Sequence, residues 1–167
     1  MTVFQTQLEW LNHLKPNFKV LPLRERLVCG CGALLGLTLS SLISWWVLGD
    51  INAWYIAPMG ASSVLLFAVP ASPLAQPWNM IIGNTLAGFI GVTCALYMPN
   101  LTEAFSIAVA LSIFLMMSTD SLHPPSGAVA ITAVLGGKSV HELGYAFIAY
   151  PVLLNSLLLL VIAIIFN

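Results

Sequence analysis

Residues Leu27–Leu48 read LVCGCGALLGLTLSSLISWWVL, a run without a single charged side chain. A helix needs about 20 apolar residues to cross the hydrocarbon core of a bilayer, and this run is long enough. Three further runs reach comparable length: Asn79–Met98, Leu101–Thr119 and Leu143–Phe166. The run Leu101–Thr119 does so if Glu103 stays at the interface. The sequence therefore predicts an all-α, polytopic membrane protein with the lipid bilayer as its surroundings.

The composition supports the same class. Of 167 residues, 59% are hydrophobic and 7% are charged, and the mean hydropathy is +0.96. Soluble domains carry about 25% charged residues, which coat their surface. The composition thus excludes a soluble enzyme and a disordered chain. The net charge of −1 offers no basic surface to a nucleic acid, and no metal-binding or cofactor motif is visible, so we expect neither metal nor cofactor.

The segment before the first span, residues 1–26, differs from the single membrane domain predicted over residues 27–167. Apolar residues recur in it at helical spacing: Phe4, Leu8, Leu11 and Leu14. This pattern predicts a short amphipathic helix over residues 3–15 that lies on the membrane surface or against the bundle. The alternative is a partly ordered tail.

Basic residues gather just before the first span. Four of the five lie there: Lys15, Lys19, Arg24 and Arg26. The positive-inside rule places this end of the chain on the cytoplasmic side. We expect the cell inner membrane, or the chloroplast envelope if the protein comes from a plant.

Two shorter apolar runs begin with proline, and they are Pro58–Val69 and Pro124–Leu135. Each covers about 18 Å as a helix, well short of a hydrocarbon core of about 30 Å. Both contain the pattern P-x-G-A, at Pro58–Ala61 and at Pro125–Ala128.

The chain thus divides into two units, 27–98 and 101–166, each composed of a span, a half-helix and a span. Interrupted segments at matching places in two halves are typical of transport sites. If the half-helices cross the membrane the repeat is inverted, and if they re-enter it is parallel.

The amino-terminal ends of the half-helices are predicted to bind a small anion. A proline suits the first helical position, and Ala57, which precedes Pro58, has no oxygen that could cap the free N–H groups. Such groups attract anions, and at membrane depth they need a partner. The predicted substrate-binding residues are Met59, Gly60, Ala61, Ser62, His123, Ser126, Gly127 and Ala128, with Ser63 and Thr132 as lesser candidates. The alternative is a pair of ordinary kinks satisfied by neighbouring Ser or Asn side chains.

Asp120 and His123 flank the second half-helix. An ionisable residue within an apolar region is a functional hypothesis by default. Asp120 is predicted to orient His123, and both are candidates for proton coupling. The alternative is that Asp120 caps a local turn. A membrane enzyme with this pair as acid and base is a rival function, but no catalytic motif supports it, and we expect no enzyme.

Small and amide residues within the spans predict helix contacts. Gly32 and Gly36 form one close-packing face, and Gly83, Ala87 and Gly91 form another, within the subunit or between subunits. A homo-oligomer is therefore expected. Three asparagines either bind a solute or join helices: Asn79, Asn84 and Asn155.

The stretch Leu122–Ala128, LHPPSGA, resembles the signature of the HPP family of integral membrane proteins. Residues Pro58–Phe67, PMGASSVLLF, are similar to a second block of that family, and Leu74–Asn79, LAQPWN, with Gly83 to a third. The resemblance implies a four-pass protein. Plant chloroplast and cyanobacterial members are associated with nitrite transport, so it also implies transport of nitrite, either passive or coupled to protons. A channel with the same site and a non-transporting scaffold remain the alternatives.

Overall fold

The computed structural model describes residues 20–48 and 53–167. The predicted amphipathic helix over residues 3–15, together with Lys15 and Lys19, lies outside the described residues. The longer helices are α2 (Leu23–Leu48), α3 (Ala53–Ala68), α4 (Pro77–Tyr97), α5 (Leu101–Ser118), α6 (Ser126–Leu135) and α8 (Leu154–Phe166). The shorter elements are η1 (Pro73–Ala75), α7 (Lys138–His141) and η2 (Ile148–Leu153).

Within the described residues, four helical segments are long and apolar enough to cross a membrane, as predicted. Two starting residues differ from the prediction by more than two positions. Helix α2 begins at Leu23 instead of Leu27, because the charged side chains of its first turn are exposed and can stay at the interface. The last span begins at Ile148 instead of Leu143. Its first turns are irregular, since Tyr150 has non-helical dihedral angles and Pro151 has no N–H to donate.

Two further apolar helices are shorter than a span, also as predicted. Helix α3 has 16 residues and α6 has 10, which correspond to about 24 Å and about 15 Å. The predicted start of the first half-helix is wrong: α3 begins at Ala53, so Pro58 lies inside the helix and not in its first turn. The second starts at Ser126, one residue after Pro125.

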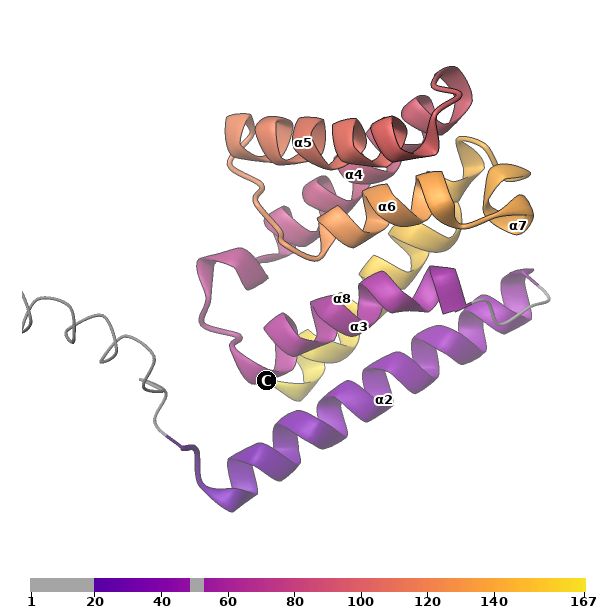
Figure 1. The fold of residues 1–167 in the computed structure, drawn as a ribbon. Coiled ribbons are helices and arrows are strands. Elements are labelled where there is room, and N and C mark those ends of the chain that lie inside the picture. The colour runs from indigo at the N-terminus through magenta and orange to yellow at the C-terminus, as the bar shows by residue number, and fades with distance from the viewer. Residues whose placement is uncertain (1–19, 49–52) are drawn as a thin grey trace, which may run out of the picture.

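The six longer helices alternate in direction. In Figure 1 α2 runs from left to right, α3 returns, and α4, α5, α6 and α8 continue the alternation. Both short helices are therefore part of the back-and-forth path of the chain. Helix α6 fills only part of its passage, because residues 119–125 before it are not helical.

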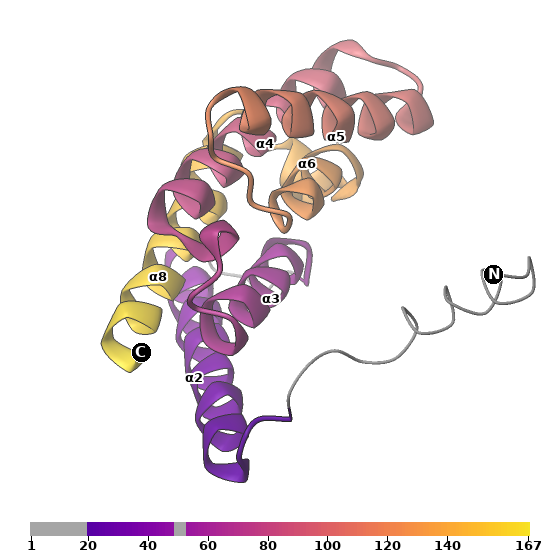
Figure 2. The same cartoon turned by 90° about the vertical axis from the view of Figure 1, so that its left-hand side faces the viewer.

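The helices pack in two groups of three (Figures 1 and 2). Helices α4, α5 and α6 contact one another, and so do α2, α3 and α8. We call the contact between the groups, made by the pairs α3–α6 and α4–α8, the seam. Each group has its own apolar core, one centred on Ala87, Ala108 and Ala130 and the other on Met59, Phe67 and Leu159.

Both predicted small-residue faces form contacts within the subunit. A Cβ on Gly91 would lie 2.7 Å from the backbone oxygen of Ala130, so α4 and α6 approach very closely there. A Cβ on Gly36 would lie 2.7 Å from Leu159, which brings α2 against α8. These faces are thus used inside one chain, so they do not support the homo-oligomer, which stays a prediction.

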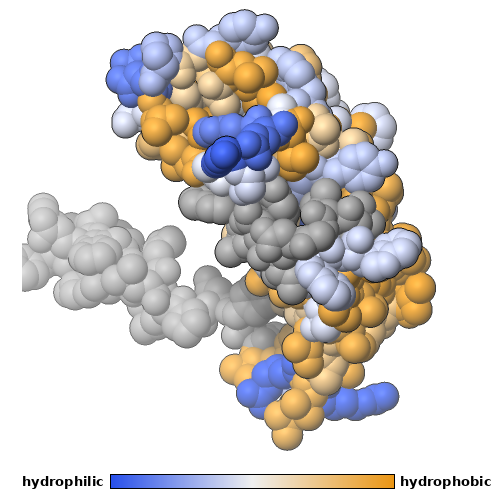
Figure 3. Space-filling view, turned by 90° about the vertical axis from the view of Figure 1, so that its right-hand side faces the viewer, coloured by the Kyte–Doolittle hydropathy of each residue, from blue (hydrophilic) through white to orange (hydrophobic). Residues whose placement is uncertain are grey.

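The outer surfaces of α2, α5 and α8 carry large apolar side chains, as a lipid-facing surface requires. Exposed examples are Leu34, Leu42, Phe114, Met117, Ile164 and Ile165. Figure 3 shows apolar residues covering much of one face of the molecule, with strongly hydrophilic residues confined to small areas. The fold is that of an integral membrane protein.

The close approach of α4 and α6 predicts the effect of an added methyl group. Gly91→Ala should lower the free energy of unfolding by about 1–3 kcal/mol, because a backbone oxygen and Ala133 must move. Gly30→Ala is the matched control, since a Cβ there meets nothing within 4 Å, and it should leave stability equal or up to about 1 kcal/mol higher. Unfolding in detergent micelles measures both variants, and equal stability would contradict the packing described here.

Candidate solute-binding site

The non-helical segment 119–125 between α5 and α6 is held by α4. Asp120 turns the chain out of α5 with a positive φ of 51°. The indole Nε1 of Trp78 donates to the Thr119 carbonyl at 3.3 Å, and Asn79 Nδ2 donates to the Leu122 carbonyl at 3.0 Å. These bonds satisfy carbonyl groups that no helix can satisfy here. The segment is therefore fixed at the point where α6 starts.

Gly83 of α4 allows this segment to come close. A Cβ at this position would lie 2.9 Å from the Ser121 carbonyl oxygen, 2.9 Å from Ser126 Oγ and 3.1 Å from His123 Cβ. Any side chain would push the segment away. The glycine thus brings His123 and Ser126 against α4.

His123 is fully buried and hydrogen-bonded through both ring nitrogens. Its Nδ1 lies 3.0 Å from the carbonyl oxygen of Leu74, and its Nε2 lies 3.0 Å from Ser62 Oγ. A carbonyl oxygen only accepts, so the Nδ1–H donates to Leu74. In the neutral ring Nε2 then accepts from the Ser62 hydroxyl. One imidazole thereby joins its own segment to η1 and to α3, across the seam.

Asn84 connects three helices in the same region. Its Oδ1 accepts from Ser126 Oγ of α6 at 2.7 Å, and its Nδ2 donates to Ser156 Oγ of α8 at 2.9 Å. All three side chains are fully buried. We call Ser62, Asn84, His123, Ser126 and Ser156 the polar cluster, and it lies at the seam between the two apolar cores.

The predicted asparagines join segments of the fold. Asn79 binds the segment before α6, and Asn84 binds α6 and α8. Asn155 accepts a bond of 2.8 Å from Ser44, which links α8 to α2. The helix-joining interpretation is therefore confirmed for Asn84 and Asn155, whereas Asn79 joins α4 to a non-helical segment. Asn84 is the one that also reaches the candidate site.

The prediction that the N–H groups at the two helix starts are free is wrong. The N–H groups of Ser126, Gly127 and Ala128 donate to the carbonyl groups of His123, Pro124 and Pro125 at 2.9, 3.1 and 3.0 Å. These are tight i→i−3 turns, which often satisfy the first donors of a helix. At α3, the N–H groups after Pro58 lie inside a helix that began five residues earlier. Neither end presents the backbone donors that the anion hypothesis required.

Three of the eight predicted binding residues converge in the polar cluster, and they are Ser62, His123 and Ser126. Met59 is buried among apolar side chains instead. The small residues of both motifs lie on the open sides of their helices: a Cβ on Gly60 or Gly127 would meet nothing within 4 Å, Ala61 is exposed and Ala128 is half-buried.

The two lesser candidates do not join the cluster. Ser63 Oγ donates to the carbonyl of Gly60 in its own helix at 2.7 Å, and Thr132 is buried in α6.

Asp120 does not orient His123. The carboxylate residue is exposed, and both ring nitrogens are bonded to Ser62 and Leu74. The acid–base pair on which the rival enzyme function rested is therefore not formed. The partner that sequence reasoning missed is a backbone carbonyl, which leaves no mark in the residue types.

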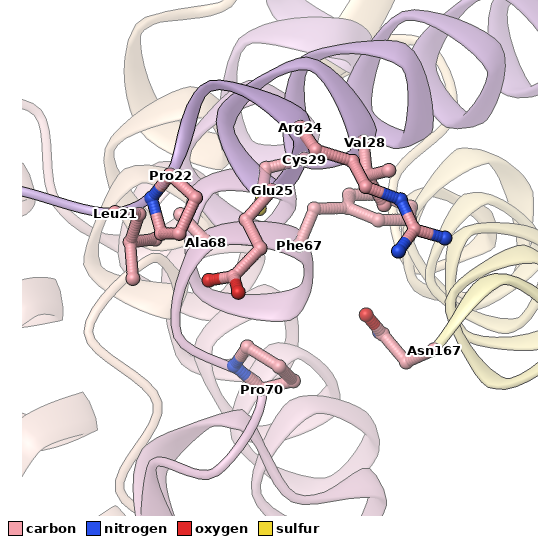
Figure 4. Close-up of a pocket in the computed structure, with 10 residues that line it drawn as sticks. All are labelled: Leu21, Pro22, Arg24, Glu25, Val28, Cys29, Phe67, Ala68, Pro70 and Asn167. Carbon is pink, nitrogen blue, oxygen red and sulfur yellow. The ribbon is translucent and has the colours of Figure 1, made fainter.

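The structure also contains a pocket of about 660 Å³ away from the polar cluster. It lies where α2 begins and α3 ends, and Figure 4 shows Arg24, Glu25, Pro70 and Asn167 around it. Ser62, His123 and Ser126 have no exposed surface. The described conformation therefore keeps the candidate site closed.

Fold and site together define a small polytopic helical membrane protein with a buried polar cluster beside a short helix that a non-helical segment precedes. Residues 19–167 match the family described as HPP, transmembrane region. The chain belongs to this family, and the resemblance of its three sequence blocks is confirmed.

Two proteins from Dictyostelium discoideum, each named only as a transmembrane protein, are similar to this chain. One is 41% identical over 116 residues, which cover 67% of this chain and 40% of the relative. The other is 39% identical over 116 residues, which cover 37% of that relative's length. The chain thus spans about two fifths of these curated relatives. No solved structure matches it.

The bond between Asn84 and Ser156 predicts a measurable coupling across the seam. A double-mutant cycle with Asn84→Ala and Ser156→Ala should give about 0.6 kcal/mol, with an upper limit of about 1.7 kcal/mol. The matched control pairs Thr85→Ala with Ser156→Ala, because Thr85 bonds only to Ile81 of its own helix among the contacts described. That coupling should be near zero. Equal couplings in the two cycles would contradict the assigned bond.

Proposed function

We propose that the protein transports a small inorganic anion across the membrane, with nitrite as the first candidate. The site consists of side chains of the polar cluster: Ser62, Asn84, His123 and Ser126. The observation that carries the proposal is His123, which is 0% exposed and bonded on both nitrogens in the non-helical segment just before α6. Polar residues at such places in membrane proteins mark solute pathways.

The depth of the cluster supports this proposal. Asn84 lies seven residues after Pro77, about 10 Å along a helix of about 32 Å. If α4 spans the bilayer, the cluster lies within the hydrocarbon region. A membrane protein keeps polar side chains there only with partners, and a functional role explains why they are retained.

The donors of the cluster suit a small oxyanion. Two hydroxyl groups and one amide group supply N–H and O–H donors, and each donates to another polar group in the closed state. An anion that binds between these donors would take the place of their present acceptors within the protein. The backbone donors of the original hypothesis are thus replaced by side-chain donors at nearly the same place.

We propose further that the two units, 27–98 and 101–166, form an inverted repeat. In such a repeat α2 corresponds to α5, α3 to α6 and α4 to α8. The group α2, α3 and α8 then corresponds to the group α5, α6 and α4, and these are the two groups observed. Opposite directions of corresponding helices support the inverted form (Figure 1). In this arrangement, transport occurs when the groups rock about the seam and expose the cluster to one side and then to the other.

The choice of nitrite rests on the family resemblance, and a flux panel tests it. Purified protein in vesicles is supplied in turn with nitrite, nitrate, formate, chloride and a neutral solute. Uptake of one or more anions above protein-free vesicles supports anion transport. A channel with the same site is distinguished by single-channel current, and equal flux with and without protein would favour a scaffold.

Substitution of the cluster predicts loss of nitrite uptake. His123→Ala and Ser62→Ala should each slow uptake into proteoliposomes by at least about tenfold, the equivalent of about 1.4 kcal/mol. The reason is that each removes a hydrogen-bonding group from the path of the anion. His141→Ala is the matched control, because this histidine of α7 bonds to the Val134 carbonyl in the last turn of α6, at the end opposite to Ser126, and the variant should retain full activity.

Gly60→Ala distinguishes an anion site made by the side chains of the polar cluster from one made by the backbone of α3. The side-chain cluster predicts unchanged uptake, since a Cβ at this position meets no atom within 4 Å. Loss of uptake in Gly60→Ala together with full activity in His123→Ala would contradict the proposed cluster. It would favour the backbone of the first short helix instead.

A further inference from the structure

We propose that His123 is the only proton carrier of the site and that each anion crosses together with one proton. This inference rests on the proposed function, because it assigns the ion coupling of the same site. Transport is then electroneutral, and Asp120 takes no part in it.

In the part of the chain that the structure describes, no other charged group lies on the elements around His123. The elements packed around it, α3, η1, α4 and α6, contain no Asp, Glu, Lys or Arg. Helix α8 contains none either. On α5, Glu103 belongs to the first turn, whereas His123 follows the last one. Asp120 is exposed. Within the described residues, His123 is thus the group at the cluster that can become positive.

The ability of His123 to become positively charged matters because an anion must be neutralised inside the membrane. An unpaired ion in a medium of low dielectric constant loses far more solvation free energy than neutral dipoles return. Serine and asparagine side chains supply only dipoles to an anion. A protonated imidazole beside the anion makes the site neutral overall, so binding of the anion favours binding of the proton.

The hydrogen bonds identify the atom that takes the proton. The Leu74 carbonyl holds the Nδ1–H, because that oxygen only accepts. Nε2 is the acceptor for Ser62 in the neutral ring. A lone pair at Nε2 repels an anion, whereas an Nε2–H donates to it and leaves the Ser62 hydroxyl free to donate as well. The proton comes from the solution on one side and leaves with the anion on the other.

The experiment uses the wild-type protein in vesicles that contain a pH-sensitive dye, with nitrite added outside. Valinomycin and a potassium gradient set the membrane potential. Protein-free vesicles give the baseline, because nitrous acid crosses lipid unaided. We expect the lumen to acidify by about one proton per anion above that baseline, and we expect an uptake rate that the potential does not change.

His123→Gln tests the assigned residue. Glutamine can donate and accept but cannot carry a proton, so the residual uptake should be slower, should depend on the potential and should no longer acidify the lumen. His141→Gln and Asp120→Asn are the matched controls, and both should retain about one proton per anion. If His123→Gln fails to fold, the wild-type stoichiometry decides the coupling and Asp120→Asn decides the role of Asp120.

The outcomes separate the two proposals. Nitrite uptake that responds to the potential without lumen acidification would overturn the coupling and leave anion transport standing. Loss of acidification in Asp120→Asn, or its retention in His123→Gln, would overturn the assignment to His123. No uptake of nitrite or of the other anions above protein-free vesicles would overturn the proposed function itself.

Discussion

The hydrocarbon core of a membrane contains no water, so each polar group in it needs a partner within the protein. The non-helical segment 119–125 between α5 and α6 has backbone groups that no helix can satisfy. Here the carbonyl groups of Thr119 and Leu122 accept from Trp78 and Asn79 of α4, and Gly83 lets the segment approach. The sequence at the start of α4 is therefore determined by a break that occurs about 40 residues later in the chain.

The spans could be predicted from the sequence because their signal is a sum over many residues. Transfer of about 20 apolar side chains gives a large free energy that local irregularities do not outweigh. The ends of the short helices depend on much smaller terms. Proline inside a helix is tolerated in membrane proteins when neighbours satisfy the freed groups, so Pro58 did not mark the start of α3. A similar local effect at Tyr150 and Pro151 delayed the regular part of the last span.

The site could be predicted by residue type but not by pairing. His123, Ser62 and Ser126 were identifiable as polar residues within apolar sequence. Their partners depend on how α3 meets the segment before α6, and 61 residues separate Ser62 from His123. The second partner of the imidazole is the Leu74 carbonyl, which every residue type possesses. Asp120, the nearest carboxylate in the sequence, was the obvious partner, yet the left-handed turn at that residue leaves it exposed.

The distribution of contacts favours motion at the seam over motion within the groups. Inside the α4–α5–α6 group, Gly91 and Ala130 bring two backbones into direct contact, and such packing deforms little. Across the seam, side chains bond Ser62 to His123 and Asn84 to Ser156, and His123 also donates to the Leu74 carbonyl of η1. Interhelical hydrogen bonds in membranes average only about 0.6 kcal/mol. In the proposed transport cycle, an anion would offer replacement acceptors to Ser62 and Asn84 and so reduce the free-energy cost of breaking these bonds, which would help the two groups to separate.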